Sequence, residues 1–434
     1  FTLATSCLTG VVFGLIPALR TSNPSLAPTL KSEATNLSGG NTHARVRKSL
    51  VVVQVTLSLL LVIGAGLFAR SLYNLRVLDP GFQPDHLLQF SVDPALNGYS
   101  DPREVDFFLQ LQERFSHVPG VKSISAAEAG FLSGMDATYT VQIEDRKNTN
   151  PNEALNPHAN FVGPRFFATL GIPVIVGREF TESDKAGAPR VCLINDKFRQ
   201  MWFRDQNPVG RHIWFNSHPE RTMEIVGVVK DTKSISLRDQ VEPFFYVPLM
   251  QDNNIGQLNF VVRTTQDPNA LSALVRRQIQ EIDNTLPIFY VQTMEAQVDR
   301  SIYVERMVAM LSVFFAALAA LLAAVGLYGV MAFTVARRTS EIGVRLALGA
   351  SRGNVLWMVM KEVVWMAALG VAFAWPLALG LGRLVKSVLY DVTANDPFTL
   401  VAATTVLSVV ALAAGLVPAL RASRISPTQA LRHE

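Results

Sequence analysis

The chain has 434 residues, of which 49% are hydrophobic and 17% charged, and its formal net charge is +4. Soluble proteins carry about 25% charged residues. The composition therefore excludes an ordinary soluble enzyme and indicates a membrane protein whose charges are concentrated between its spans. The length allows two or three domains.

Five uncharged stretches are each about as long as a spanning helix, which needs roughly 20 apolar residues. They are residues 1–19, 50–69, 307–336, 363–382 and 397–420. The chain opens inside the first stretch, and no basic segment precedes it, so we do not interpret it as a signal peptide. None of the five contains Asp, Glu, Lys, Arg or His, which argues against an ion-coupled carrier.

A short repeat explains this opening. Residues 14–22 read GLIPALRTS and residues 415–423 read GLVPALRAS, identical at seven of nine positions. We interpret residues 1–20 as the last transmembrane helix of a preceding homologous half, and the rest as one complete half. The two halves would then pair as a pseudo-dimer, with a homodimer as the alternative.

The charges of the loops predict the orientation. Residues 20–49, 337–362 and 421–434 hold 13 Lys or Arg against 4 acids, whereas residues 70–306 hold 24 basic and 29 acidic residues. The excess of positive charge on short cytoplasmic loops places the three short segments inside and the large domain outside the cell membrane. Segments 21–49 and 421–434 are then a flexible cytoplasmic linker and a cytoplasmic tail. Basic residues at the linker's end indicate contact with membrane lipids, and we expect no binding to nucleic acid.

The outer domain, residues 70–306, alternates strand and helix signals. Strands are predicted at residues 86–92, 121–127 and 137–144, and again at 257–264 and 288–292, with helices after 101 and 267. The pattern predicts a split ferredoxin-like module interrupted by a mostly-β insertion at about residues 157–248. Residues 294–306 are predicted to be a helix that runs into the third span, so that domain and span would move as one rod. The fold class is thus an α+β membrane protein with a helical bundle and a large extracytoplasmic domain.

Motifs in the insertion carry a family resemblance. Residues 161–203 contain LGIP, GREF, a following acid and LIN, and they are followed by NPVGR and IVGVVKD. This series resembles the periplasmic core domain of MacB-type permeases. Residues 307–420, with EIGVRLALGAS and with PALRAS at their C-terminal end (residues 418–423), resemble the FtsX-like permease domain, and the doubling resembles the duplicated permeases abundant in acidobacteria. The resemblance implies a permease of an ABC system that transmits ATP-driven motion to an extracytoplasmic domain.

The sequence lacks the motifs of an enzyme. It has no Gly-Lys dipeptide, so it has no P-loop, and it has no HExxH motif. We therefore expect a non-catalytic subunit without cofactor or metal site, with ATP bound by a separate cytoplasmic ABC ATPase. Its seven His are scattered, and Cys192 in VCLIN is expected to be a buried, unpaired thiol.

The cytoplasmic segment 337–353 is the candidate contact with that ATPase. Charged and apolar residues alternate there as in a short amphipathic helix, with Gly349 as a plausible C-cap. By resemblance, residues Glu341, Arg345, Gly349 and Ser351 would receive the ATPase; a simple tether on anionic lipid is the alternative. Pro376 in the fourth span is a candidate hinge, or simply a tolerated kink.

Two functions remain open. The first is export or extrusion of a substrate of the macrolide, peptide or lipid-like classes, which the resemblance implies. The second is an FtsX-like signalling or scaffolding role that regulates an envelope enzyme such as a hydrolase. An envelope adaptor is a further candidate partner, and the large two-part outer domain favours export.

Overall fold

The computed structural model describes residues 39–135, 137–144, 155–204, 206–251, 256–385, 387–393 and 395–424. The chain divides into two compact units. We call the first, with residues up to 67, 311–388 and from 393 onward, the membrane unit. The second, Phe68–Met310 with Leu389–Val392, is the outer unit. The predicted span at residues 1–20 and the tail beyond residue 424 lie outside the described residues.

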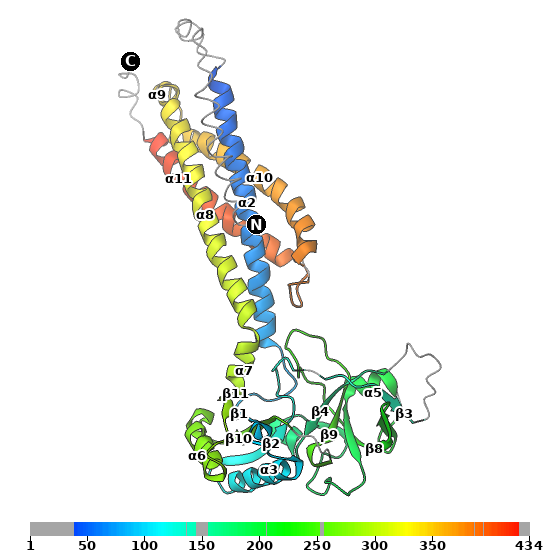
Figure 1. Cartoon of the computed structure of the whole chain (residues 1–434). Coiled ribbons are helices and arrows are strands. Elements are labelled where there is room, and N and C mark those ends of the chain that lie inside the picture. The colour runs from blue at the N-terminus through cyan, green and yellow to red at the C-terminus, as the bar shows by residue number, and fades with distance from the viewer. Residues whose placement is uncertain are drawn as a thin grey trace, which may run out of the picture. The chain divides into compact units, whose positions relative to one another are not determined.

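Four helices within the described residues are long and apolar enough to cross a membrane. They are α2 (Gly39–Val77), α8 (Tyr303–Arg337), α10 (Arg352–Val385) and α11 (Pro397–Ser423), with the short α9 (Thr339–Ala347) between α8 and α10 (Figure 1). They coincide with the last four predicted spans and extend beyond them. Residues 39–49, which we assigned to the flexible linker, form the first turns of α2, so that part of the prediction was wrong. Helical hydrogen bonding continues past the apolar stretch because nothing in residues 39–49 after the Gly pair breaks it.

Small residues and hydroxyls hold the helices of the membrane unit together. The Thr56 hydroxyl donates to the Gly370 carbonyl of α10 at 3.2 Å, and the Ser58 hydroxyl donates to the Ala319 carbonyl of α8 at 2.9 Å. A methyl group at Gly370 would lie 2.5 Å from the nearest methyl of Val55, which shows how closely α2 and α10 approach. In lipid, such close backbone contacts and interhelical hydrogen bonds replace the hydrophobic effect as the source of association.

The ferredoxin-like module is confirmed in the outer unit. Its strands are β1 (Leu87–Val92), β2 (Val121–Ala127), β10 (Leu258–Thr264) and β11 (Ile288–Thr293), and its helices are α3 (Asp101–Ser116) and α6 (Ser272–Ile282). The strands lie in the order β11-β1-β10-β2, and each neighbouring pair is antiparallel. Phe90 and Phe260 belong to one hydrophobic cluster with residues of α3 and α6, whereas Leu87 and Val261 belong to a second cluster on the other face.

The insertion is larger than the sequence indicated. Its strands are β3 (Val141–Ile143), β4 (His158–Val162), β5 (Val174–Gly177), β6 (Val191–Asn195), β7 (His212–Phe215), β8 (His218–Val229) and β9 (Phe244–Pro248), with the short helices α4 (Phe166–Leu170) and α5 (Asp196–Trp202). We placed residues 137–144 in the ferredoxin-like module, but β3 pairs with β7 at the far end of the sheet order. The insertion therefore begins soon after β2, not at residue 157. Alternation alone does not identify a strand's partner.

The predicted rod at residues 294–306 is interrupted. Helix α7 (Met294–Ser301) is followed by Ile302, whose φ of −108° and ψ of 17° leave the helical region, and α8 starts at Tyr303. Met294 and Ile302 are both buried in the second cluster of the outer unit. The break between the two helices thus lies where these side chains pack into the core of the outer unit. The uniform helical pattern of the sequence did not reveal it.

Candidate coupling segment

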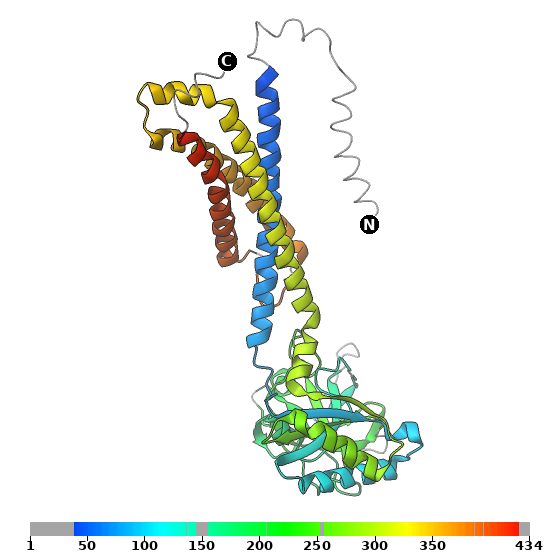
Figure 2. The same cartoon turned by 90° about the vertical axis from the view of Figure 1, so that its left-hand side faces the viewer.

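The segment between α8 and α10 is a short helix between two turns. Helix α9 turns sharply away from the end of α8, and Arg338 forms the joint with a φ of −100° and a ψ of 15° (Figure 2). Ile342 and Gly343 are the buried residues of α9 and fix one face of it to the bundle. The opposite face carries the charged residues singled out from the sequence.

Glu341 and Arg345 are brought together on that face. They lie one helical turn apart, and the Arg345 guanidinium reaches the Glu341 carboxylate at 2.6 Å, with both side chains about half exposed. An exposed pair at this spacing stabilises a helix by roughly 0.3–0.5 kcal/mol. The pair therefore helps α9 to form and also presents a positive and a negative group to the solvent.

Gly349 and Ser351 shape the turn that follows. Gly349 has a φ of +92°, the left-handed conformation that ends helices, and the Ala350 N–H donates to the Arg345 carbonyl at 3.0 Å. The Ser351 hydroxyl accepts the Asn354 N–H at 3.3 Å at the start of α10. Both residues thus stabilise the tight turn that joins α9 to α10.

Leu348 is the residue that sequence reasoning missed. It lies at the tip between α9 and the turn, and 82% of its surface is exposed. Val344, one turn before it, is also exposed. A single exposed leucine is ordinary, but here two apolar side chains flank a salt-bridged pair on a segment fixed by its buried face. This combination is typical of a small protein-contact surface.

Glu362 anchors α10 beside this segment. Its carboxylate accepts from Lys48 of α2 at 2.7 Å and from Arg338, at the joint before α9, at 2.9 Å. Arg47 adds a contact over the Phe333 ring of α8, with its guanidinium carbon 4.1 Å from the ring centre. Three helices and the joint are therefore tied at one end of the bundle. The sequence showed these residues only as members of a basic segment.

Pro376 lies inside α10, as predicted, beside Trp375, whose indole N–H donates to the Thr404 hydroxyl of α11 at 3.1 Å. The contact holds this part of α10 against α11. The hinge role of Pro376 stays a prediction.

Two family profiles match this chain. A family profile described as "MacB-like periplasmic core domain" matches residues 50–282, more than half of the chain. A second, described as "FtsX-like permease C-terminal", matches residues 313–427. The chain belongs to the MacB-like permease family. Its four candidate spans and its large outer unit fit a multi-pass membrane protein with an extracytoplasmic domain.

The individual relatives have low sequence identity to this chain. The permease is 26% identical over 290 residues to the pyoverdine export ATP-binding/permease protein PvdT of Pseudomonas syringae pathovar tomato, covering 64% of this chain and 43% of the relative. It is 23% identical to the uncharacterised ABC transporter permease YknZ of Bacillus subtilis, covering 70% of this chain and 77% of the relative. The chain thus spans less than half the length of PvdT. The crystal structure of the periplasmic region of MacB from Actinobacillus actinomycetemcomitans aligns with 52% of this chain and 95% of its own, at 17% identity and a TM-score of 0.33.

The sequence motifs on which the resemblance rests have structural roles in the permease. In GREF, Arg178 binds the Asp184 carboxylate through two nitrogens at 2.8 and 2.9 Å, and Glu179 accepts the Phe167 N–H at 2.7 Å. Burial on its own would raise the pKa of Asp184, but hydrogen bonds from Arg178 and Thr181 outweigh it and hold the pKa below its usual range. Asn195, in LIN, caps α5 by accepting the Phe198 N–H and also accepts the Phe244 N–H. These residues fix loops in the insertion and do not line a site.

Within the described residues, no group of three or more His, Cys, Asp or Glu is placed to hold a metal. His212 instead bonds Glu144 at 2.7 Å on the surface of the insertion. Cys192 is fully buried in β6, and burial raises the pKa of its thiol. It is a small core residue, as the sequence predicted.

Proposed function

We propose that this permease couples a separate cytoplasmic ABC ATPase to its extracytoplasmic domain, with α9 and the following turn as the receiving surface. The observation that carries the proposal is the exposed Leu348 beside the Glu341–Arg345 pair, on a helix whose other face is buried. An apolar side chain with a charged pair at its rim is the composition that a protein contact needs.

Helix α8 is the element suited to pass the motion on. It is continuous from Tyr303 to Arg337, and α9 follows directly at its end. Residues up to Met310 group with the outer unit and those from Leu311 with the membrane unit, so one helix is part of both. Force applied to α9 would therefore act on an element that the outer unit contains. Because Glu362 of α10 forms salt bridges with Lys48 of α2 and with Arg338, α2 and α10 would move with α9.

Export or extrusion of a substrate is the function we favour for this coupling. A relative that aligns with 64% of this chain is named for pyoverdine export. These 434 residues contain no Gly-Lys dipeptide and hence no P-loop, so in this proposal ATP is bound outside them. The regulatory alternative makes the same coupling contact and differs in what the outer domain acts on.

The test replaces the exposed leucine. The full chain is reconstituted in lipid nanodiscs with the ABC ATPase that copurifies with it, and ATP hydrolysis is measured. We expect Leu348→Ser to lower stimulation of the ATPase at least tenfold, because a fully buried leucine at a contact contributes about 1.5–3 kcal/mol. Leu96→Ser is the matched control, because Leu96 is similarly exposed but belongs to the outer unit.

A charge swap separates coupling from helix stability. The double variant Glu341→Arg with Arg345→Glu keeps an ion pair at the same spacing, so α9 remains folded. We expect the swap to lose ATPase stimulation while membrane insertion is unchanged. Full stimulation by both the swap and Leu348→Ser would show that the ATPase contacts the chain elsewhere and that α9 is a tether on lipid.

A further inference from the structure

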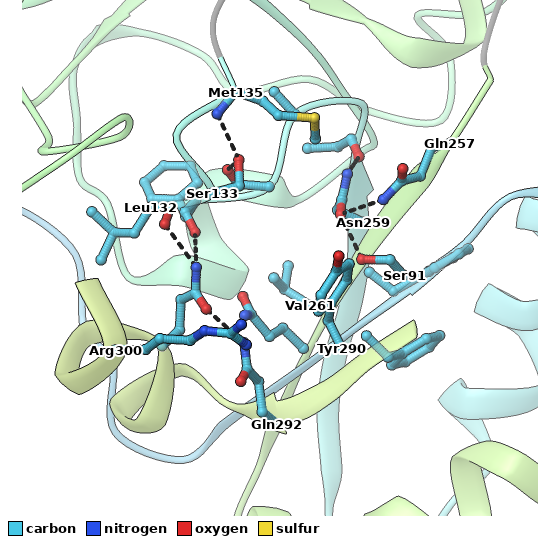
Figure 3. Close-up of a pocket in the computed structure, with 18 of the residues that line it drawn as sticks. Ser91, Leu132, Ser133, Met135, Gln257, Asn259, Val261, Tyr290, Gln292 and Arg300 are labelled. Atoms are coloured by element: carbon cyan, nitrogen blue, oxygen red, sulfur yellow. Dashed lines mark hydrogen bonds between the residues drawn. The ribbon is translucent and has the colours of Figure 1, made fainter. Parts of the chain in front are cut away.

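The outer unit contains a pocket that the coupling function does not use. Its volume is about 360 Å³, within the 300–1,000 Å³ range of small-molecule sites. Its floor is the face of the ferredoxin-like sheet made by β1, β10 and β11, and its walls are the loop of residues 129–135 and helix α7 (Figure 3). All of these elements belong to the outer unit.

The floor of the pocket is polar because of strand alternation. Leu87 and Val261 are packed into the second cluster, but the next positions on the same face are polar. Ser91 pairs directly with Asn259, and Gln89 pairs with Gln292. The face is therefore hydrophobic under α4 and lined with hydroxyl and carboxamide groups where the pocket opens.

Hydrogen bonds hold several of these groups in place. The Asn259 side chain accepts from the Ser91 hydroxyl at 2.6 Å and donates to the Ala127 carbonyl of β2 at 3.4 Å. Gln297 of α7 is 91% buried; it donates to the Leu132 carbonyl at 2.7 Å and accepts from Gln292. These contacts fix the wall to the floor. A ligand would meet donors and acceptors that are already oriented, which lowers the entropic cost of binding.

The Tyr290 side chain lines this pocket, and the Tyr290 backbone adopts an unfavourable conformation there. It lies in β11 at a shift of register against β1, and its φ is +53°, which is strained for an aromatic residue. Its side chain is 61% exposed, and Figure 3 shows it standing beside Ser91 and Val261. A bulge that turns a side chain toward a cavity is a common device next to binding sites.

Arg300 gives the pocket its charge. It is the only charged residue among those lining the pocket, and it makes no ion pair with any acid in the described part of the chain. Figure 3 shows it on the α7 side beside Gln292. Phe131, Met135 and Phe166 line the pocket as apolar groups. The cavity therefore combines one cationic group, several neutral hydrogen-bonding groups and an apolar part of its lining.

We propose that this pocket binds a small extracytoplasmic molecule with the chemistry of an N-acylated amino acid. The carboxylate would pair with Arg300, which suits planar anions. The ligand's amide would bond the Gln292 and Tyr290 groups, and its short apolar chain would lie against Phe131 and Met135. The absence of an acid from the lining excludes a cationic ligand as the preferred occupant.

The test uses two probes that differ in a single group. N-acetyl-leucine carries the carboxylate, and N-acetyl-leucinamide carries a neutral amide instead. Binding to the full chain in nanodiscs is measured by ligand-observed NMR without ATP or an ATPase, so failure of the coupling proposal would not affect it. We expect the acid to bind at least tenfold more tightly than the amide, because only the carboxylate can form a charge-assisted hydrogen bond with Arg300.

Two variants and a control complete the test. Arg300→Gln should lose the preference for the acid, so that both probes bind equally weakly. Ala129→Phe, which places a ring in the cavity, should abolish binding of both. Arg276→Gln, an exposed arginine on α6, should bind like the natural chain. Equal binding of the two probes to the natural chain, or an unchanged preference in Arg300→Gln, would overturn the proposal.

Discussion

Polar and charged side chains of the insertion hold its backbone in place. Asp184 receives the Arg178 guanidinium, the Thr181 N–H and the Thr181 hydroxyl, and it thereby closes the loop after β5. Asn195 and Glu179 similarly accept backbone N–H groups. Buried donors left without such acceptors would cost about 1–3 kcal/mol each. In this chain these motif positions therefore have structural roles, which the motif alone does not reveal.

The Arg178–Asp184 pair predicts a dependence of stability on pH. Because the folded state lowers the pKa of Asp184, its contribution is present above the unfolded value of about 3.9 and is lost as the pH falls through the folded value. We expect Asp184→Asn to unfold at lower urea than the natural chain at pH 7, and the difference to shrink below about pH 4. Arg178→Gln should give the same pattern, and combining the two should add little. A difference that stays constant from pH 7 to pH 3 would contradict this account.

At the level of helices, close contacts decide how the membrane unit packs. Added methyl groups at Gly66 and Gly415 would lie 2.7 and 2.6 Å from side chains of neighbouring helices, much as at Gly370. Glycines were visible in the sequence, but GxxxG patterns are common in apolar stretches and did not show which glycines touch. Gly380 and Gly329, in the same helices as Gly370 and Gly326, have open space instead.

This contrast gives a prediction with an internal control. Gly370→Ala should destabilise the permease by about 1–3 kcal/mol, because Val55 is stiff and cannot move aside easily. Gly380→Ala should be neutral or slightly stabilising, because alanine is the better helix former and nothing lies near. Unfolding of the full chain by SDS in mixed micelles measures both. Adding Val55→Ala to Gly370→Ala should restore part of the loss; no recovery would mean that the contact is not the cause.

The molecule as a whole divides into a membrane unit and an outer unit, and the long helices α2 and α8 contribute residues to each. Charge and hydropathy gave this division from the sequence, because a spanning helix and its flanking charges are local properties. The order of the strands is not local. The ferredoxin-like pairs β1–β10 and β10–β2 bring together residues more than a hundred positions apart, across the whole insertion.

The orientation of the two units predicts which residues a reagent outside the cell can reach. In a Cys7→Ser background, Leu96→Cys should react with a membrane-impermeant maleimide in intact cells, and Leu348→Cys should react only after permeabilisation. Cys192 contributes no background, because it is fully buried. Labelling of Leu348→Cys in intact cells would place α9 outside and refute the coupling proposal.

Local patterns thus determined the last four spans, the strands of the ferredoxin-like module and the position of the segment around Glu341. Periodicity, turn residues and charge are properties of neighbouring residues, so the sequence alone carries them. Tertiary structure decided what these patterns do together. It assigned β3 to the insertion, interrupted the rod at Ile302, tied Glu362 to Lys48 and Arg338, and left Leu348 exposed. It also closed a pocket from strands, a loop and a helix that lie far apart in the chain, because only packing brings such residues to one place.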